Sequence, residues 1–185
     1  MSRLSFAPVA ALVAAVSMCA TARAQVNHPV PVLGQRWQPW AGDRLGWGGS
    51  GSTIGRFGCG LTSIAMIRSY AAGYTITPRQ LNESLKQTGV FSGDLLIWSR
   101  TPGYVTTRDY TSVPADLGYI RGVLNSGYLV IAETRLGGSM HFVVLKGFSG
   151  DTFYMNDPWY ADNPTFNARY GSPARYIYKV HVYKR

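Results

Sequence analysis

Cysteine is nearly absent from this sequence of 185 residues, which contains only Cys19 and Cys59. Small secreted domains that depend on disulfides contain many more cysteines, so a disulfide-stabilised scaffold is excluded. If the first 24 residues are removed, Cys59 has no possible intramolecular partner. A lone cysteine is either a small buried core residue or a thiol with a chemical use, and its presence alone leaves both interpretations open.

The sequence also has no apolar run long enough to cross a membrane, which takes about 20 residues. The uncharged stretch from Phe6 to Met18 follows the basic Arg3 and precedes Ala22-Arg23-Ala24, a small-x-small cleavage site. This pattern is typical of a signal peptide. We therefore expect residues 1–24 to be cleaved after Ala24, leaving a secreted or periplasmic chain, residues 25–185, without a transmembrane segment.

Acidic residues and histidines are scarce, at 9 and 3 against 18 Lys and Arg. The histidines, His28, His141 and His181, show no paired ligand spacing, so we expect no metal and no cofactor. Because Arg3 and Arg23 belong to the signal peptide, residues 25–185 carry 16 basic and 9 acidic residues, a net charge of +7. This charge favours the cell wall or another anionic surface, but the basic residues are scattered, so we expect no nucleic-acid binding.

Two frequent catalytic motifs are missing. No Gly-x-Ser-x-Gly sequence is present, which argues against a serine hydrolase with a nucleophile elbow. The glycine-rich run 49–55 lacks the Lys-Ser/Thr that follows a phosphate-binding loop. We expect this run to be a flexible loop at a cleft.

Helical patterns dominate the first half of residues 25–185, and they are predicted over 61–72, 77–87 and 114–125. The first segment is mostly small and apolar and ends at Gly73, a typical C-cap. The second begins with Thr77-Pro78-Arg79-Gln80, in which Thr77 and Gln80 match a capping box. Residues 90–113 remain ambiguous.

Strand patterns dominate the second half, and they are predicted over 128–134, 140–148, 152–156 and 175–184. The second strand is apolar on both faces at Phe142 to Leu145, as in the centre of a sheet. The turn Ser149-Gly150-Asp151 joins it to the next strand. We expect a single α+β domain over 25–185, with helices first and then an antiparallel sheet, and with 90–113 and 160–174 as specificity loops.

Cys59 lies at the start of the first predicted helix, between Gly58 and Gly60. A helix N-terminus stabilises a thiolate through its free N–H groups and its dipole. The two glycines allow a sharp turn and a close approach of substrate. The position therefore suits a nucleophile.

His141 precedes the most apolar strand, and Asp157 ends the strand that follows it by a hairpin turn. Antiparallel pairing places the start of one strand beside the end of the other, so Asp157 can accept the second N–H of His141. The alternatives are a core histidine and an ordinary Asp-Pro turn, and position alone does not exclude them. Trp159 can shield the pair from water.

Three sequence blocks together resemble the bacteriocin-processing, double-glycine-leader cysteine peptidases, and most closely their stand-alone, secreted, papain-like relatives. The blocks are Gly58 to Ser63, Met140 to Val144 with Gly147, and Asn156 to Trp159. The resemblance implies a papain-like fold, with Cys59 as nucleophile, His141 as general base and Asp157 as its orienting carboxylate. Leu61 departs from the proline that relatives often have after Gly-Cys-Gly, but leucine preserves the helix.

The resemblance also implies a glutamine that donates to the oxyanion, and the block from Gln35 to Ala41 contains two. Spacing favours Gln35 over Gln38. An amide N–H, together with the Cys59 backbone N–H, suits this task. We further expect Gly58, Gly60 and Trp159 to contact substrate.

These observations predict a monomeric cysteine peptidase that hydrolyses peptide bonds outside the cytoplasm through a thioester. A cell-wall peptide amidase, endopeptidase or transpeptidase of the same fold is the first alternative. A peptide-binding module without activity is the second.

Overall fold

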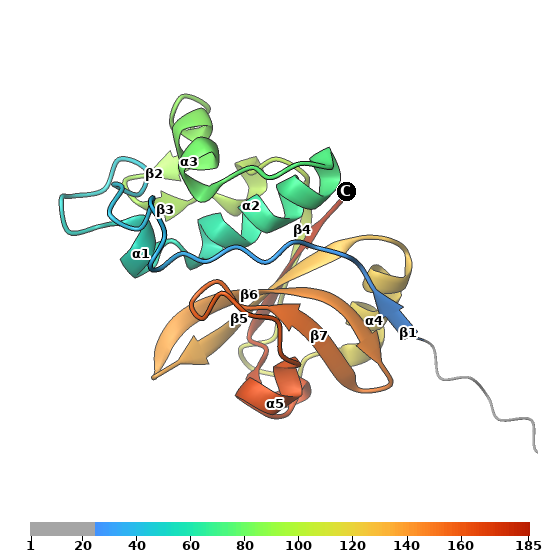
Figure 1. Ribbon diagram of the computed structural model, residues 1–185. Coiled ribbons are helices and arrows are strands. Elements are labelled where there is room, and N and C mark those ends of the chain that lie inside the picture. Colours follow the sequence, from blue (N-terminus) through green and yellow to red (C-terminus); the bar gives the residue numbers. More distant parts are fainter. Residues whose placement is uncertain (1–24) are drawn as a thin grey trace, which may run out of the picture.

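The computed structural model describes residues 25–185 and consists of a central sheet with helices on both faces (Figure 1). The predicted signal peptide, residues 1–24, lies outside the described residues. The elements follow in the order β1 (Gln25–Asn27), α1 (Ile54–Phe57), α2 (Cys59–Ala72), α3 (Pro78–Lys86), β2 (Phe91–Ser92), β3 (Leu95–Leu96), a 3-10 helix (Trp98–Arg100), β4 (Tyr104–Asp109), α4 (Leu117–Asn125), β5 (Leu129–Leu136), β6 (Ser139–Ser149), β7 (Thr152–Asn156), α5 (Phe166–Tyr170), α6 (Pro173–Tyr176) and β8 (Lys179–Tyr183).

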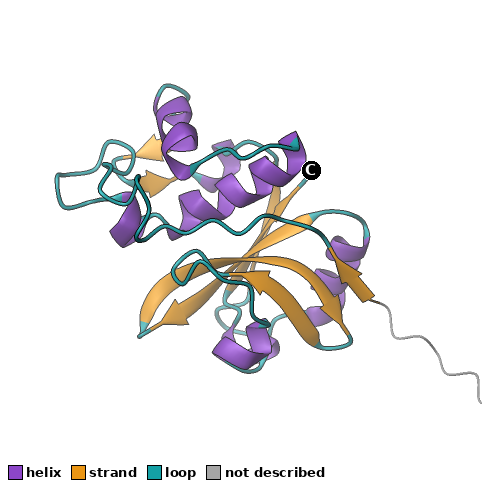
Figure 2. Ribbon diagram, viewed as in Figure 1, coloured by secondary structure: helices purple, strands orange, loops and turns teal. Residues whose placement is uncertain are grey.

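The main sheet has six strands, and all of its pairings are antiparallel. β6 pairs with β5 over its first half and with β1 over its last three residues, while β7 pairs along the opposite edge. β8 and β4 extend the sheet beyond β5. β2 and β3 form a separate two-stranded hairpin within the helical layer (Figure 2).

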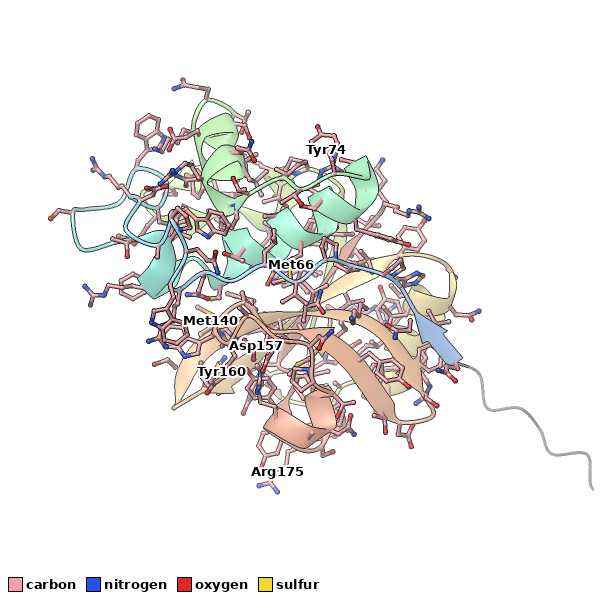
Figure 3. All side chains as sticks on the ribbon, in the orientation of Figure 1. Met66, Tyr74, Met140, Asp157, Tyr160 and Arg175 are labelled. Atoms are coloured by element: carbon pink, nitrogen blue, oxygen red, sulfur yellow. The ribbon has the colours of Figure 1, made fainter. Side chains whose placement is uncertain are left out.

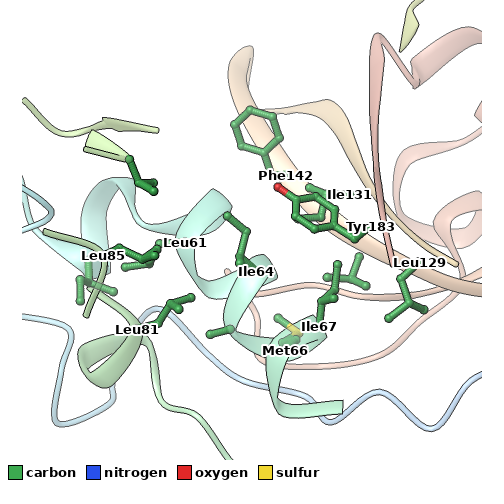
Figure 4. Packing of buried hydrophobic residues seen from close by; sticks show 14 of the residues in the cluster. Leu61, Ile64, Met66, Ile67, Leu81, Leu85, Leu129, Ile131, Phe142 and Tyr183 are labelled. Carbon is green, nitrogen blue, oxygen red and sulfur yellow. The ribbon is translucent and has the colours of Figure 1, made fainter. Parts of the chain in front are cut away.

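The side chains of β6 alternate between two hydrophobic cores, which confirms that this strand is central. Phe142 and Val144 join the core beneath α2, whereas Val143 and Leu145 join the core on the other face, beneath α4 and α5. Figure 4 shows Ile64 of α2 packing toward the sheet in the first of these cores. This core therefore holds the helical layer against one face of the sheet.

The predicted starts and ends of the first two helices agree with the structure. α2 begins at Cys59 and ends at Ala72, and its C-cap is Gly73, whose φ of 76° is the left-handed value that favours glycine. Thr77 and Gln80 form the complete capping box at the start of α3. Within residues 25–185, no helix has the length and apolar character of a membrane span.

Two boundaries and the order of the elements differ from the prediction. α4 begins at Leu117 rather than 114, because the Asp116 side chain accepts a hydrogen bond from Tyr119 N and caps the helix there. The last strand begins at Lys179 because Pro173–Tyr176 form α6. The α+β class is confirmed, but β4 lies before α4 in the chain, so the helices and strands are less segregated than predicted.

Candidate active site

Cys59 is the first residue of α2, and its side chain is a partly exposed free thiol. Gly58 links α1 to α2, and a Cβ on it would lie 2.5 Å from the Ile54 carbonyl oxygen, within the preceding turn. Only a glycine permits this close approach. This close packing of α1 against the start of α2 fixes the position of Cys59, whose side chain lines the cleft.

His141 is the third residue of β6 and is almost completely buried, with 2% of its surface exposed. Its Nε2 lies 3.0 Å from Asp157 Oδ1. The Cys59 side chain lines the same cleft and favours the charged imidazole, which raises the pKa of His141. The structure thus brings His141 and Asp157 into direct contact and places Cys59 in the same cleft wall as His141.

Asp157 follows directly after β7 and is completely buried. Its Oδ1 also accepts a hydrogen bond from Trp159 N at 3.0 Å. Its Oδ2 accepts bonds from Tyr170 Oη at 2.6 Å and from Arg169 Nη1 at 3.1 Å. Four donors therefore fix the carboxylate, and Figure 3 shows Asp157 below the central strands, above the α5 region.

The pKa values in this group favour charged forms. Burial lowers the pKa of His141, but the hydrogen bonds and charges of Asp157 and Cys59 outweigh burial and raise it from 6.5 to about 9. Burial raises the pKa of Asp157, but the hydrogen bond and charge of His141, with the bonds from Tyr170 and Trp159, lower it overall. A protonated imidazole beside a carboxylate is the favoured state near neutral pH.

A cleft of about 1120 Å³ opens over these groups, between the helical layer and the sheet. Cys59, Gly60, His141 and Trp159 all line it. Gly58 does not line it and is buried, so its function is the chain junction rather than the expected substrate contact. The glycine-rich run 49–55, expected at the cleft, does not line it either.

Comparison with known protein families shows to which family this combination of residues and fold belongs. The model of the Peptidase_C39 like family matches residues 29–183, most of the chain. The chain belongs to this family.

Other comparisons add little. The search of curated proteins gave no match. Among solved structures, the chain is similar to a candidate C39-like peptidase from Bacillus anthracis, with a TM-score of 0.48, 17% identity, and coverage of 88% of this chain and 98% of that chain. Membership of the C39-like family identifies the chain as a cysteine peptidase-like hydrolase and agrees with the papain-like α+β fold that the resemblance implies.

Gln35 lies in the wall of the C39-like cleft, and Gln38 is not among the lining residues. The Gln35 side chain is completely buried and its Nε2 donates to the Gly55 carbonyl at 3.2 Å, which leaves a second N–H on the same nitrogen. Its backbone N–H donates to the Pro158 carbonyl at 2.8 Å. This bond ties the N-terminal arm to the turn that carries Asp157.

The partners of Asp157 on α5 were missed by sequence reasoning, which assigned 160–174 to loops. Thr165 caps α5 through a bond from Ala168 N, and this cap is a local signal that could have predicted the helix. Nothing local indicates that Arg169 and Tyr170 reach Asp157. Arg169 is itself oriented by two bonds of 2.6 Å to Asp162.

The other two histidines lie apart from the triad. His28 contacts the Leu124 carbonyl at 2.9 Å. His181 is buried, stacks on Trp98 at 3.9 Å between ring centroids, and contacts Thr107 Oγ1 through Nδ1 at 2.7 Å. Residues 25–185 contain no group of three or more His, Cys, Asp or Glu side chains placed to hold a metal ion.

Proposed function

We propose that this chain is a cysteine peptidase that cleaves peptide bonds through a thioester acyl-enzyme. The observation that supports it best is the contact of His141 with the buried Asp157, in the same cleft as Cys59 at a helix start. The Asp157 carboxylate contacts Nε2 of His141, so Nδ1 is the ring nitrogen that can exchange a proton with the Cys59 sulfur. This division of the two ring nitrogens suits the pairing of a nucleophile with a base and an orienting group.

In the first step, the Cys59 thiolate attacks the carbonyl carbon of the scissile amide, and the C=O electron pair moves to oxygen. Gln35 Nε2 and the Cys59 backbone N–H are the proposed donors to this oxyanion. The intermediate collapses as His141 gives its proton to the leaving amine, which leaves a thioester on Cys59. Water then attacks the thioester, His141 takes one water proton, and the C–S bond breaks to release the acid and to restore the Cys59 thiolate beside the protonated His141.

A peptide digest tests this proposal. We expect Cys59→Ala and His141→Ala to lower the rate by several orders of magnitude on a mixed peptide library read by mass spectrometry. His28→Ala is the matched control, because His28 lies outside the triad and should leave the rate nearly unchanged. Iodoacetamide should modify Cys59 quickly near neutral pH in the wild type and slowly in His141→Ala. Full cleavage by Cys59→Ala would refute the mechanism.

We also propose that the protein acts outside the cytoplasm, as the pattern of Arg3, the apolar stretch 6–18 and Ala22-Arg23-Ala24 predicts. The measurement is the intact mass of protein recovered from the native host. A mass that still includes residues 1–24 would contradict it.

The net charge of +7 on residues 25–185 favours one alternative substrate, the peptides of an anionic cell wall. Incubation of the enzyme with purified peptidoglycan separates this cell-wall function from that of a general peptidase. Release of wall peptides by the wild type but not by Cys59→Ala would favour the cell-wall function, and cleavage of soluble peptides alone would favour the general peptidase.

A further inference from the structure

One arm of the cleft has apolar walls from both layers of the molecule. We call it the apolar subsite, and it consists of Leu95, Leu96, Trp98, Leu136, Met140 and Phe142. Leu95 and Leu96 come from the β2–β3 hairpin of the helical layer, whereas Leu136, Met140 and Phe142 come from the β5–β6 hairpin. Leu95 and Met140 are 68% and 56% exposed, so their apolar side chains have few partners within the chain.

The apolar subsite adjoins the reacting groups directly. A Cβ on Gly60, the residue after Cys59, would lie 3.1 Å from both Leu96 Cδ1 and Trp98 Cη2. Met140 immediately precedes His141, and Figure 3 shows it at the end of the sheet below α1. A side chain that enters this arm therefore belongs to a substrate residue close to the bond that Cys59 attacks.

Three charged residues of the cleft wall, Glu133, Lys179 and Asp109, form ion pairs within the chain. Glu133 lies 2.8 Å from Arg135, and Lys179 lies 3.4 Å from Asp109. On the opposite wall, Asp94 accepts a hydrogen bond from Ser52, and Arg56 donates to the Gly51 carbonyl. Asp94 and Arg56 therefore have only neutral hydrogen-bond partners, but neither belongs to the apolar subsite, whose six side chains carry no charge.

The exposure of Leu95 and Met140 has a physical consequence. Apolar side chains that face water beside a cleft gain free energy when another apolar group covers them. A glycine would leave the walls of this arm in water, and a charged side chain would lose hydration without finding an opposite charge among the six residues of the subsite. A large aliphatic or aromatic side chain satisfies both conditions.

We propose that the apolar subsite binds a large apolar side chain, such as Leu, Met or Phe, of the peptide substrate, next to the scissile bond. This proposal rests on the proposed peptidase function and adds the chemical class of its substrate. It assigns specificity to the two hairpins, with Leu95 and Met140 as the outermost contacts.

Binding to the inactive Cys59→Ala variant tests the subsite without requiring cleavage. The probe is a library of acetylated, amidated heptapeptides in which one position at a time is fixed as Leu, Phe, Gly, Lys or Asp. Peptides retained on the immobilised protein are measured by mass spectrometry. We expect retention at one position to be at least about tenfold greater for Leu or Phe than for Gly, the scale of one buried apolar side chain. Lys and Asp should give no enrichment.

Two further variants in the same background locate the effect. Leu95→Asp and Met140→Asp each place a charge on the rim, and both should remove most of the preference for Leu and Phe. Val113→Asp is the matched control, because Val113 is 59% exposed and does not line the cleft. It should keep the full preference. Thermal unfolding of each variant shows whether the fold is retained.

The outcomes separate the subsite from the proposed function. Equal retention of Leu, Phe and Gly peptides, or an undiminished preference in both rim variants, would overturn the subsite. A preference in binding without any Cys59-dependent cleavage by the wild type would support the subsite and contradict the hydrolytic function. Cleavage that requires Cys59 but shows no preference for apolar side chains would support the hydrolytic function and contradict the subsite.

Discussion

At the scale of single residues, the carboxylate of Asp157 has a fixed orientation because each of its oxygens has two donors. Tyr170 and Arg169 hold Oδ2, which keeps Oδ1 toward His141 and Trp159 N. A completely buried carboxylate needs such partners, since removing it from water without them costs several kcal/mol. Burial and the nearby Asp157 charge raise the pKa of Tyr170, so its hydroxyl stays protonated and remains a donor. Tyr170 is therefore a positioning residue for the imidazole.

Replacement of Tyr170 by Phe tests this positioning. We expect kcat on a cleaved peptide to fall roughly tenfold while KM changes little, because the imidazole loses alignment rather than substrate contact. The acidic limb of the pH profile should move to higher pH, since the Tyr170 hydrogen bond is one cause of the lowered pKa of Asp157. Tyr176→Phe is the control, because Tyr176 packs against the same core without contacting Asp157. An unchanged kcat and acidic limb would refute the role.

At the scale of elements, the junction of α1 and α2 determines where the nucleophile lies. Gly58 is at once the C-cap of α1 and the N-cap of α2. The nearest atoms to a Cβ at this position belong to Ile54, and they include backbone atoms that cannot rotate away. Any larger residue must shift the start of α2, and Cys59 moves with it.

Gly58→Ala should therefore destabilise the protein by roughly 1–3 kcal/mol, the usual cost of overpacking, and should also lower the rate of Cys59 alkylation. Gly122→Ala is the matched control. Gly122 is an exposed helical glycine of α4, and a Cβ added to it would meet no atom within 4 Å, so alanine should stabilise by up to about 1 kcal/mol. Urea unfolding measures both changes. Equal stability of the two variants would contradict the packing argument.

At the scale of the whole molecule, the candidate site joins two layers. Cys59 belongs to the helical layer, whereas His141 and Asp157 belong to the sheet. The interaction of the protonated imidazole with Cys59 and Asp157 thus links the layers across the cleft. Because the pKa of His141 is about 9 in the folded protein and 6.5 ordinarily, the folded state binds this proton more tightly than the unfolded state.

The sign of the pH effect follows from this raised pKa. The stabilisation from His141 is fully present below about pH 6.5 and is lost as the pH rises through about 9. We expect the free energy of unfolding of the wild type to decline over this range relative to His141→Ala, as measured by urea titration at each pH. Peptide hydrolysis should also fall above about pH 9, because the imidazole no longer carries the proton for the leaving amine. A constant difference in stability between the two proteins would contradict the raised pKa.

Much of the site follows from local sequence. The capping and glycine signals that start and end α2 involve residues a few positions apart, and they place Cys59 at a helix start. The turn after Ser149 pairs β6 with β7, and this pairing brings Asp157 beside His141. Such patterns can be predicted from the sequence because residues that are close in the chain come into contact independently of the rest of the fold.

The sequence by itself therefore determined the α+β class, the helix that begins at Cys59 and the hairpin that carries His141 and Asp157. Only the tertiary structure decided that Arg169 and Tyr170 hold Asp157, that His181 is buried under Trp98, and that two distant hairpins form an apolar subsite. These contacts join segments that no short-range signal relates. They exist because the two hydrophobic cores pack the layers in one arrangement, and side-chain packing of that kind is a property of the assembled fold.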